Sequence, residues 1–180
     1  MRIRRIGYGI LLLVFGSGAA LAQGTAGNDA LQRFLVEAKK HTYASQGDSA
    51  SMKPLLSGTR QLEYSQGPFL YRDIYVGEST FAGQEIVYES GKPVWTTSYA
   101  GHIRPGIDAR EVAAVVKLLH VALMRVPLEE PYRGPRRVEQ GAYTYTNRVQ
   151  GQLDSFHGEE AIARGETKLY ELHYGGGLVR

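Results

Sequence analysis

Cysteine is absent from this sequence of 180 residues, and tryptophan and methionine are scarce, with one and three copies. The absence of cysteine excludes a disulfide framework, a thiolate zinc site, a cysteine nucleophile and a lipid-anchored cysteine. The five histidines are scattered, and no two of them stand four residues apart as the ligands of a helical zinc site do. A glycine-rich phosphate loop and a nucleophile elbow are also missing. We therefore expect no metal and no cofactor.

Positive and negative charges are also nearly balanced, because the formal net charge is only +3. Three arginines lie among the first five residues, an apolar run over 10–15 follows, and the stretch ends in Ala20-Leu21-Ala22. This order of charged start, short apolar centre and small-residue exit predicts a signal peptide over residues 1–22. The protein would then be exported, to the periplasm or outside the cell. The alternative, an N-terminal membrane anchor, needs about 20 apolar residues, more than this stretch provides.

Cleavage after Ala22 would remove three of the 21 basic residues and none of the 18 acidic ones, leaving a formal net charge of zero. A nucleic-acid-binding protein needs a basic surface to displace counterions. We therefore expect no nucleic-acid partner, and no membrane association once the signal peptide is removed. A small molecule and a protein partner both remain open, and so does the oligomeric state.

Apolar spacing predicts two helices. Residues 23–30 are small and polar, typical of a flexible lead-in, and a helix with one apolar stripe is expected from Asn28 or Asp29 to about His41. A second helix is expected over 109–125, with Asp108 as its N-cap and Glu111 completing a capping box. Apolar residues cover most of the circumference of this second helix, which predicts a central position in the fold.

A period of two indicates strands over 61–101, where we expect three to four, and again over 143–180. The two segments repeat each other at an offset of 74 to 75 residues. Phe-x-Gly-x-Glu-x-aliphatic occurs in both copies, as Phe81–Val87 and Phe156–Ile162. We predict an α+β fold made of two tandem α-β-β-β repeats, about 31–103 and 108–180. The halves would be related by a pseudo-twofold axis, with an antiparallel sheet packed on the central apolar helix. The alternative to a true repeat is that the two segments are unrelated hairpins, which look alike only because hairpins use similar residues.

The repeat places Glu85 and Glu160 on strand faces that are otherwise apolar. Because a buried carboxylate is costly without a partner, each glutamate should pair with a cation, a tyrosine or a backbone amide. Two such carboxylates near a pseudo-axis can do acid/base work. Asp73 is a further candidate, found only in the first half, because the matching residue of the second half is Asn147. The alternative is structural, with each Glu holding the two halves together.

Aromatic residues recur at matched positions and form the second group of candidates. Stacking on a concave sheet would suit a sugar or another flat ligand, although such residues are also common in protein cores. The ligand-binding candidates are Trp95, Tyr99, Tyr71, Tyr170, Tyr174 and Arg133. Arg133 belongs to a short Arg- and Pro-containing segment for which a solvated loop is the alternative interpretation.

Several short motifs carry a resemblance to a known family. They include Tyr71-Arg72-Asp73-Ile74-Tyr75, Phe81-Ala82-Gly83-Gln84-Glu85 and the closing Tyr174-Gly175-Gly176-Gly177. Together with the segments 34–44, 91–95 and 131–135, they make the chain resemble the bacterial family called domain of unknown function 5680, over about 31–179. The family brings no established activity. Some members carry a helix-turn-helix domain, which implies a sensory or ligand-binding module, whereas this chain begins with the predicted signal peptide.

The function expected from these observations is that of an exported, non-enzymatic module that binds a small ligand or interacts with a partner. The neutral charge after cleavage, the duplicated aromatic sheet and the lack of a catalytic signature favour it. The alternative is a periplasmic hydrolase that uses the paired carboxylates Glu85 and Glu160, or Asp73. A third interpretation is a structural domain that packs against a partner through an exposed apolar patch.

Overall fold

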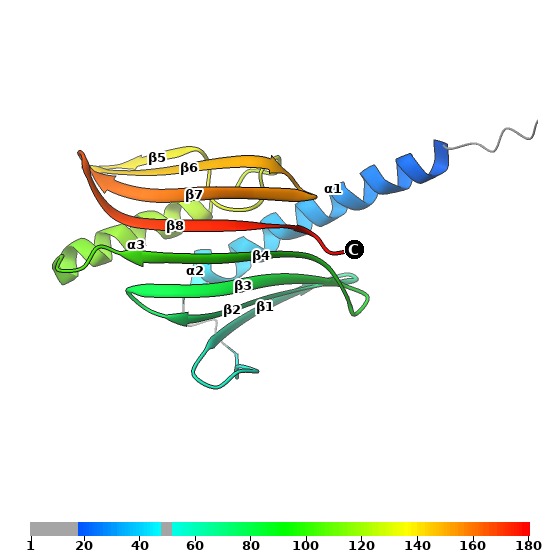
Figure 1. Cartoon of the computed structure of the whole chain (residues 1–180), viewed down its shortest axis with the longest axis horizontal. Helices are drawn as coiled ribbons and strands as arrows, with labels where there is room; N and C mark the ends of the chain where they lie inside the picture. Colours follow the sequence, from blue (N-terminus) through cyan, green and yellow to red (C-terminus); the bar gives the residue numbers. More distant parts are fainter. Residues whose placement is uncertain (1–17, 48–51) are drawn as a thin grey trace, which may run out of the picture.

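The computed structural model describes residues 18–47 and 52–180, in which one antiparallel sheet of eight strands carries helices on one face (Figure 1). The strands are β1 (Arg60–Gln66), β2 (Phe69–Gly77), β3 (Thr80–Glu89), β4 (Lys92–Ile103), β5 (Arg137–Gln140), β6 (Tyr143–Gln152), β7 (Ser155–Arg164) and β8 (Thr167–Leu178). The helices are α1 (Gly18–His41), α2 (Tyr43–Gln46) and α3 (Ala109–Leu123). The strand order across the sheet is β1-β2-β3-β4-β8-β7-β6-β5, so that β4 and β8 form a central seam.

The predicted α+β arrangement, with two α-β-β-β repeats around a central apolar helix, is wrong. The protein is dominated by a single sheet, and four strands lie on each side of the seam. Helix α3 covers one face of that sheet near β5 and β6. It buries one side through Val115, Leu118, Leu119, Ala122 and Leu123. Its remaining apolar residues misled the prediction, because Ala113 and Met124 are exposed to solvent.

Each half has four strands, one more than the predicted α-β-β-β unit, although the first-half count lies within the three to four strands expected over 61–101. The first strands of the two halves, β1 and β5, form the two edges of the sheet. Strand β1 reads RQLEYSQ and buries only two residues, and β5 is four residues long and buries one. Edge strands are commonly short and charged, because such residues prevent unwanted pairing with other chains. In β5, with one buried residue in four, almost no alternating apolar pattern is left by which the strand could be recognised in the sequence.

From each edge toward the seam, four strands follow one another in chain order, β1 to β4 on one side and β5 to β8 on the other. The Phe-x-Gly-x-Glu pattern lies in the third strand of each series, β3 and β7. The pairing is matched as well: Asp73 lies opposite Glu85 between β2 and β3, and Asn147 lies opposite Glu160 between β6 and β7. The internal repeat predicted from the sequence would account for this symmetry.

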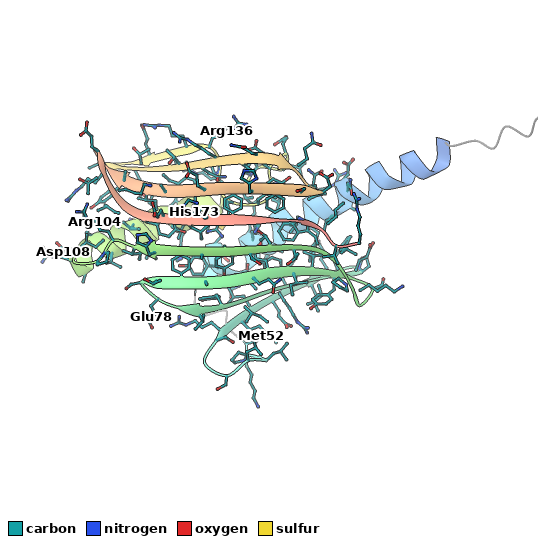
Figure 2. All side chains as sticks on the ribbon, in the orientation of Figure 1. Met52, Glu78, Arg104, Asp108, Arg136 and His173 are labelled. Atoms are coloured by element: carbon teal, nitrogen blue, oxygen red, sulfur yellow. The ribbon has the colours of Figure 1, made fainter. Side chains whose placement is uncertain are left out.

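Asp108, labelled in Figure 2, is confirmed as the N-cap of α3, because its side chain accepts a hydrogen bond of 2.8 Å from the Glu111 amide. Helix α1 begins at Gly18, earlier than predicted, and includes the expected lead-in 23–30. The predicted signal peptide falls mostly on residues 1–17, outside the described residues, and its cleavage point after Ala22 falls within α1. Within 18–47 and 52–180, no helix combines the length and the apolarity needed to cross a membrane.

The seam between β4 and β8 depends on close backbone contact at Gly176. A Cβ atom built there would overlap the Thr96 carbonyl and lie 2.7 Å from the Thr97 Cα. Because these are backbone atoms of the paired strand, the seam itself must move to make room. Gly176→Ala is expected to lower the free energy of unfolding by about 1 to 3 kcal/mol, the range of overpacking in a core. Denaturant unfolding measures this loss.

The neighbouring Gly175 is the matched control for this substitution. A Cβ atom there would meet its nearest neighbour, the Phe156 carbonyl, at 3.4 Å, which is ordinary contact. We therefore expect Gly175→Ala to change stability by no more than about 0.5 kcal/mol. Equal losses in the two variants would contradict the assignment of the close approach to Gly176.

Candidate functional site

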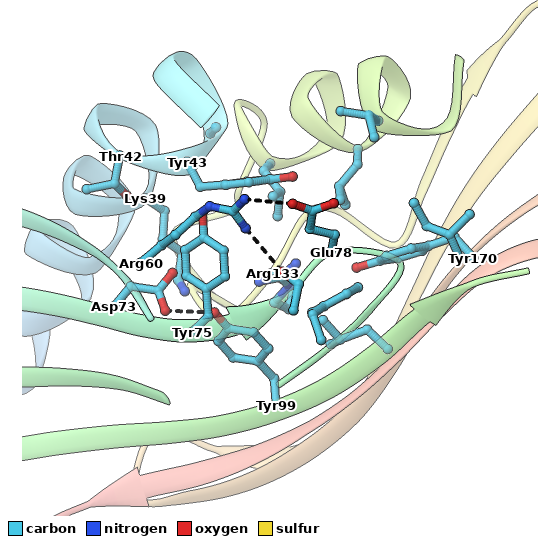
Figure 3. Close-up of a pocket in the computed structure, with 18 of the residues that line it drawn as sticks. Lys39, Thr42, Tyr43, Arg60, Asp73, Tyr75, Glu78, Tyr99, Arg133 and Tyr170 are labelled. Carbon is cyan, nitrogen blue, oxygen red and sulfur yellow. Dashed lines mark hydrogen bonds and ion pairs between the residues drawn. The ribbon is translucent and has the colours of Figure 1, made fainter. Parts of the chain in front are cut away.

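A cavity of about 470 Å³ lies between the helices and the first-half strands of the sheet (Figure 3). Its aromatic lining comes from six side chains: Tyr43, Tyr71, Tyr75, Phe81, Tyr99 and Tyr170. Its charged lining comes from six more: Lys39, Arg60, Asp73, Glu78, Glu85 and Arg133. Apolar residues of α3, among them Val112, Val116 and Leu119, complete the wall. The volume and the mixed lining are typical of small-molecule sites.

Lys39 and Glu85 form a buried ion pair at this cavity. The Lys39 Nζ atom of α1 lies 2.5 Å from Glu85 Oε2, and the two side chains are 5% and 2% exposed. The Lys39 ammonium also lies over the rings of Tyr71 and Trp95, at 5.8 and 5.9 Å from their centroids. Burial lowers the pKa of Lys39, although the Glu85 charge opposes this shift. The position of Lys39 follows from the helix, since residue 39 stands four residues after the buried Leu35 on the apolar side of α1.

Asp73 is a buried carboxyl group whose hydrogen-bond partner is a tyrosine hydroxyl group. Within the described part of the chain, no cation bonds to it. Tyr99 donates to its Oδ1 atom at 2.7 Å, and the residue is 6% exposed. Burial and then the charge of the adjacent Glu85 raise the pKa of Asp73 to about 7. The Tyr99 hydrogen bond and the charges of Lys39 and Arg133 act in the opposite direction without cancelling these effects. Asp73 thus changes its charge near neutral pH.

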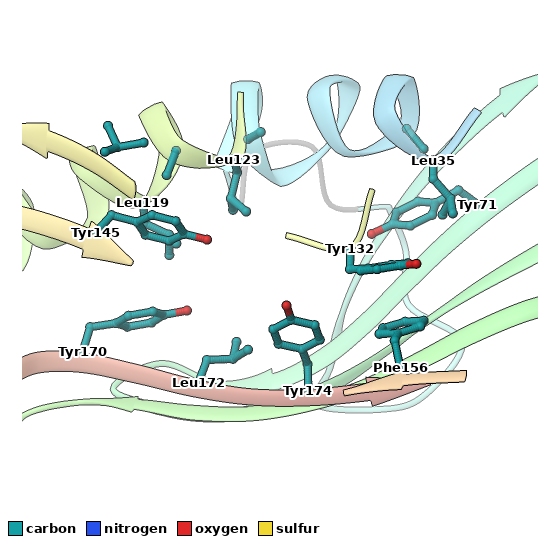
Figure 4. Packing of buried hydrophobic residues seen from close by; sticks show 14 of the residues in the cluster. Leu35, Tyr71, Leu119, Leu123, Tyr132, Tyr145, Phe156, Tyr170, Leu172 and Tyr174 are labelled. Atoms are coloured by element: carbon teal, nitrogen blue, oxygen red, sulfur yellow. The ribbon is translucent and has the colours of Figure 1, made fainter. Parts of the chain in front are cut away.

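Glu160, the counterpart of Glu85 in the second half, is fully occupied by three donors. Arg133 Nη2 donates to it at 2.5 Å, and the hydroxyl groups of Tyr145 and Tyr170 donate at 2.6 Å each. Figure 4 shows these two tyrosines projecting into the same interior space. Burial opposes the ionised form, but the Arg133 charge and the three hydrogen bonds outweigh it and lower the pKa of Glu160. Glu160 is therefore a buried anion of the core, away from the cavity lining.

Arg133 connects the two glutamates. Its Nη1 atom lies 3.8 Å from Glu85, while its Nη2 atom contacts Glu160. The residue is 9% exposed, whereas Arg136 in the same segment has a side chain that is 80% exposed, so a solvated loop describes Arg136 and not Arg133. Burial disfavours the cation, but Glu160, Tyr170 and Glu85 together raise the pKa of Arg133 well above its usual value. Arg133 is a permanent positive charge beneath the cavity.

The second half carries asparagine where the first half carries aspartate. Asn147 accepts from the Tyr174 hydroxyl at 2.8 Å, as Asp73 accepts from Tyr99, and it donates to the Gly134 carbonyl at 2.8 Å. It is 4% exposed. Both ends of its amide are thus used inside the protein, and the position has lost the titratable group.

The structure brings together most of the predicted site residues. Asp73, Glu85, Tyr71, Tyr99, Tyr170 and Arg133 line the cavity. Trp95, Tyr174 and Glu160 lie in the core instead; Trp95 is fully buried and stacks on Phe156 at a centroid distance of 5.7 Å. Sequence reasoning missed Lys39, Tyr43, Arg60 and Glu78. A lysine on the apolar stripe of α1 was the available signal for the first of these.

Comparison with known proteins adds a family but no activity. No curated protein and no solved structure matches this chain. A family model described as "Domain of unknown function (DUF5680)" matches residues 73–179, which is more than half of the chain. The match begins at Asp73 and includes Glu85, Tyr99, Arg133 and Tyr170, whereas Lys39 and Tyr71 lie before it. The chain therefore belongs to this family of unknown biochemical function, as its sequence resemblance indicated.

Proposed function

We propose that the protein is an exported module that binds a small molecule in the cavity beside Asp73. The observation that carries this proposal is the group of buried ionisable side chains, Lys39, Asp73 and Glu85, on an aromatic cavity of about 470 Å³. Buried charges are expensive, and well-packed apolar residues of similar size are often more stable in their place. Their presence at an open cavity therefore supports a functional role, as perturbed groups in clefts generally do.

Export is part of the proposal and rests on the first 22 residues. Their arginines, short apolar run and small-residue ending are typical of a segment that is cleaved during secretion. Cleavage after Ala22 would leave a chain beginning at Gln23, with the helical residues that carry Lys39 intact. Recovery of a cytoplasmic chain that still begins at Met1 would contradict export.

Filling the cavity tests the binding role. Val112→Trp is expected to abolish the thermal stabilisation that small molecules give the wild-type protein, because Val112 lines the cavity and a Trp side chain there would occupy it. The measurement is a thermal-shift screen of a metabolite and glycan collection, followed by calorimetric titration of each compound that stabilises the wild type. A screen in which no compound binds the wild type would contradict the proposed function.

Ala113→Trp is the matched control, since Ala113 is the next residue of α3 and is exposed to solvent. It introduces the same side chain into the same helix without entering the cavity, so ligand binding is expected to persist. Loss of binding in both variants would show that the Val112 effect comes from the helix and not from the cavity.

A hydrolase is the second candidate, and Asp73 is the observation that favours it. The pair Glu85 and Glu160 is poorly suited to catalysis, because Arg133 lies against both carboxylates and Glu160 is already occupied by three donors. Asp73 lies opposite Glu85 in the cavity, and its pKa of about 7 suits a general acid. The test is whether the wild-type protein converts a bound compound into a product and whether Asp73→Asn loses this activity. Both results together would replace the binding role by a catalytic one.

A further inference from the structure

The charges at the cavity are unbalanced when Asp73 is ionised. Arg60 and Glu78 of the lining lie 3.1 Å apart and balance each other. Beside this pair, three carboxylates face two cations; the carboxylates are Asp73, Glu85 and the core residue Glu160, and the cations are Lys39 and Arg133. Both cations are already engaged, since Lys39 bonds to Glu85 and Arg133 bonds to Glu160, each at 2.5 Å. The ionised cavity therefore lacks one positive charge, and Asp73 is the carboxylate that is left without a cation.

The lining beside Asp73 suits a cation on an apolar body. Tyr71, Tyr75 and Tyr99 present aromatic rings and hydroxyl oxygens, and aromatic rings attract cations through their negative faces. Tyr71 itself makes no hydrogen bond to any other described residue, so its hydroxyl group is available to a ligand. Apolar residues of α3 face this group from the opposite wall.

An anionic ligand finds no comparable partner. The Arg133 Nε atom has no hydrogen-bond partner among the described residues, but it is fully buried and so is closed to a molecule in the cavity. The remaining donors of Lys39 and Arg133 lie beside Glu85 and Glu160, whose charges would repel an anion. Arg60, the third cation of the lining, already pairs with Glu78 at 3.1 Å. The charges of the site thus favour a cationic ligand over an anionic one.

We propose that the cavity binds an organic monocation, an amine on an apolar body, whose ammonium group pairs with Asp73. This inference rests on the proposed binding function and adds the chemical class of the ligand. The ammonium group takes the place of the proton that Asp73 carries in the empty protein at low pH. Binding below neutral pH therefore releases one proton from Asp73, and binding at higher pH releases none.

The groups that face Asp73 come from every element around it, and none of them supplies the missing charge. They are Lys39 of α1, Tyr71 of the same strand β2, Glu85 of β3, Tyr99 of β4 and Arg133 of the segment before β5. Arg60 of the neighbouring strand β1 also lines the cavity, where it pairs with Glu78 at 3.1 Å. Burial and the Glu85 charge raise the pKa of Asp73 to about 7. Affinity for an amine should therefore rise about tenfold from pH 6 to pH 8 and then level off, following the ionisation of Asp73.

The experiment is calorimetric titration of the exported chain with three matched sets of compounds: phenylalkylamines with one to four methylene groups, the corresponding alcohols and the corresponding carboxylates. We expect the amines to bind at least tenfold more tightly than the alcohols and the carboxylates not to bind. Titration at pH 6 in buffers of different ionisation enthalpy should report the release of one proton.

Two variants assign the effect to Asp73. Asp73→Asn should lose at least tenfold in amine affinity together with its pH dependence, and it should remain folded, since Asn occupies the matching position 147. Glu159→Gln removes an exposed carboxylate from β7 and should leave the affinity unchanged. Tighter binding of the carboxylates, equal binding of all three sets, or no binding by any amine overturns the inference. In the first two cases the cavity remains a binding site, so the proposed function survives.

Discussion

Arg133→Met is expected to lower the free energy of unfolding by about 3 to 5 kcal/mol, the usual effect of removing one partner from a buried ion pair. The variant leaves Glu160 buried with two tyrosine hydroxyls and no cation, and it removes a second positive charge from the side of Glu85. Methionine preserves much of the side-chain volume, so the loss comes from the uncompensated charge and not from an empty space. Denaturant unfolding at pH 7 measures it.

Arg136→Met is the control in the same segment. Arg136 also pairs with a glutamate, Glu130, at 2.8 Å, but its side chain is 80% exposed. Exposed pairs contribute little, so this change should cost less than about 1 kcal/mol. Similar losses in the two variants would show that the pairing of Arg133 with Glu160 does not stabilise the fold in the way its burial implies.

Asp73→Asn is expected to stabilise the protein, and more so as the pH rises. The pKa of Asp73 is raised from 3.8 to about 7 in the folded state, so the folded protein holds this proton more tightly than the unfolded chain. Stability is therefore lost from about pH 4 up to about pH 7, as Asp73 is forced to ionise in the core. A rise of this size corresponds to roughly 4 kcal/mol at most. Asparagine avoids the loss and still accepts the Tyr99 hydrogen bond.

Unfolding curves at pH 4 and pH 8 check this prediction. The difference between variant and wild type should be near zero at pH 4 and largest at pH 8. The reverse exchange, Asn147→Asp, provides the control, because it places an acid against the Gly134 carbonyl that Asn147 now donates to. That variant should be destabilised, again most strongly at pH 8. Stabilisation by Asp73→Asn that does not vary with pH would contradict the role given to ionisation.

Much of the site could be predicted because its residues stand out against their strands. Glu85 and Glu160 interrupt apolar faces, and this alone predicts that they are buried and partnered. What could not be predicted is that the same pattern has two outcomes: Glu85 lines a cavity, and Glu160 is sealed under Tyr145 and Tyr170. That difference depends on Arg133, which reaches both glutamates from a segment without regular structure.

The layout of the fold was harder to predict than its elements. The capping residues of α3 and the turns around β2 and β3 have local signals, because their hydrogen bonds join near neighbours in sequence. The arrangement of α3 over one face depends on contacts with β5 and β6, and apolar composition does not specify such contacts. The edge strand β5 has little local signal, since it is four residues long and buries one residue.

The seam between β4 and β8 has a consequence for the order in which the chain folds. Trp95 pairs with Leu178 and Ile103 with Tyr170, so the middle of the sheet joins residues 67 to 83 positions apart in the chain. Strand β8 follows all the others in sequence, and until it emerges from the ribosome β4 has one unpaired edge. Non-local pairing of this kind slows folding. A nascent chain that has not completed its sheet stays unfolded longer, and the export proposed above would draw on that unfolded state.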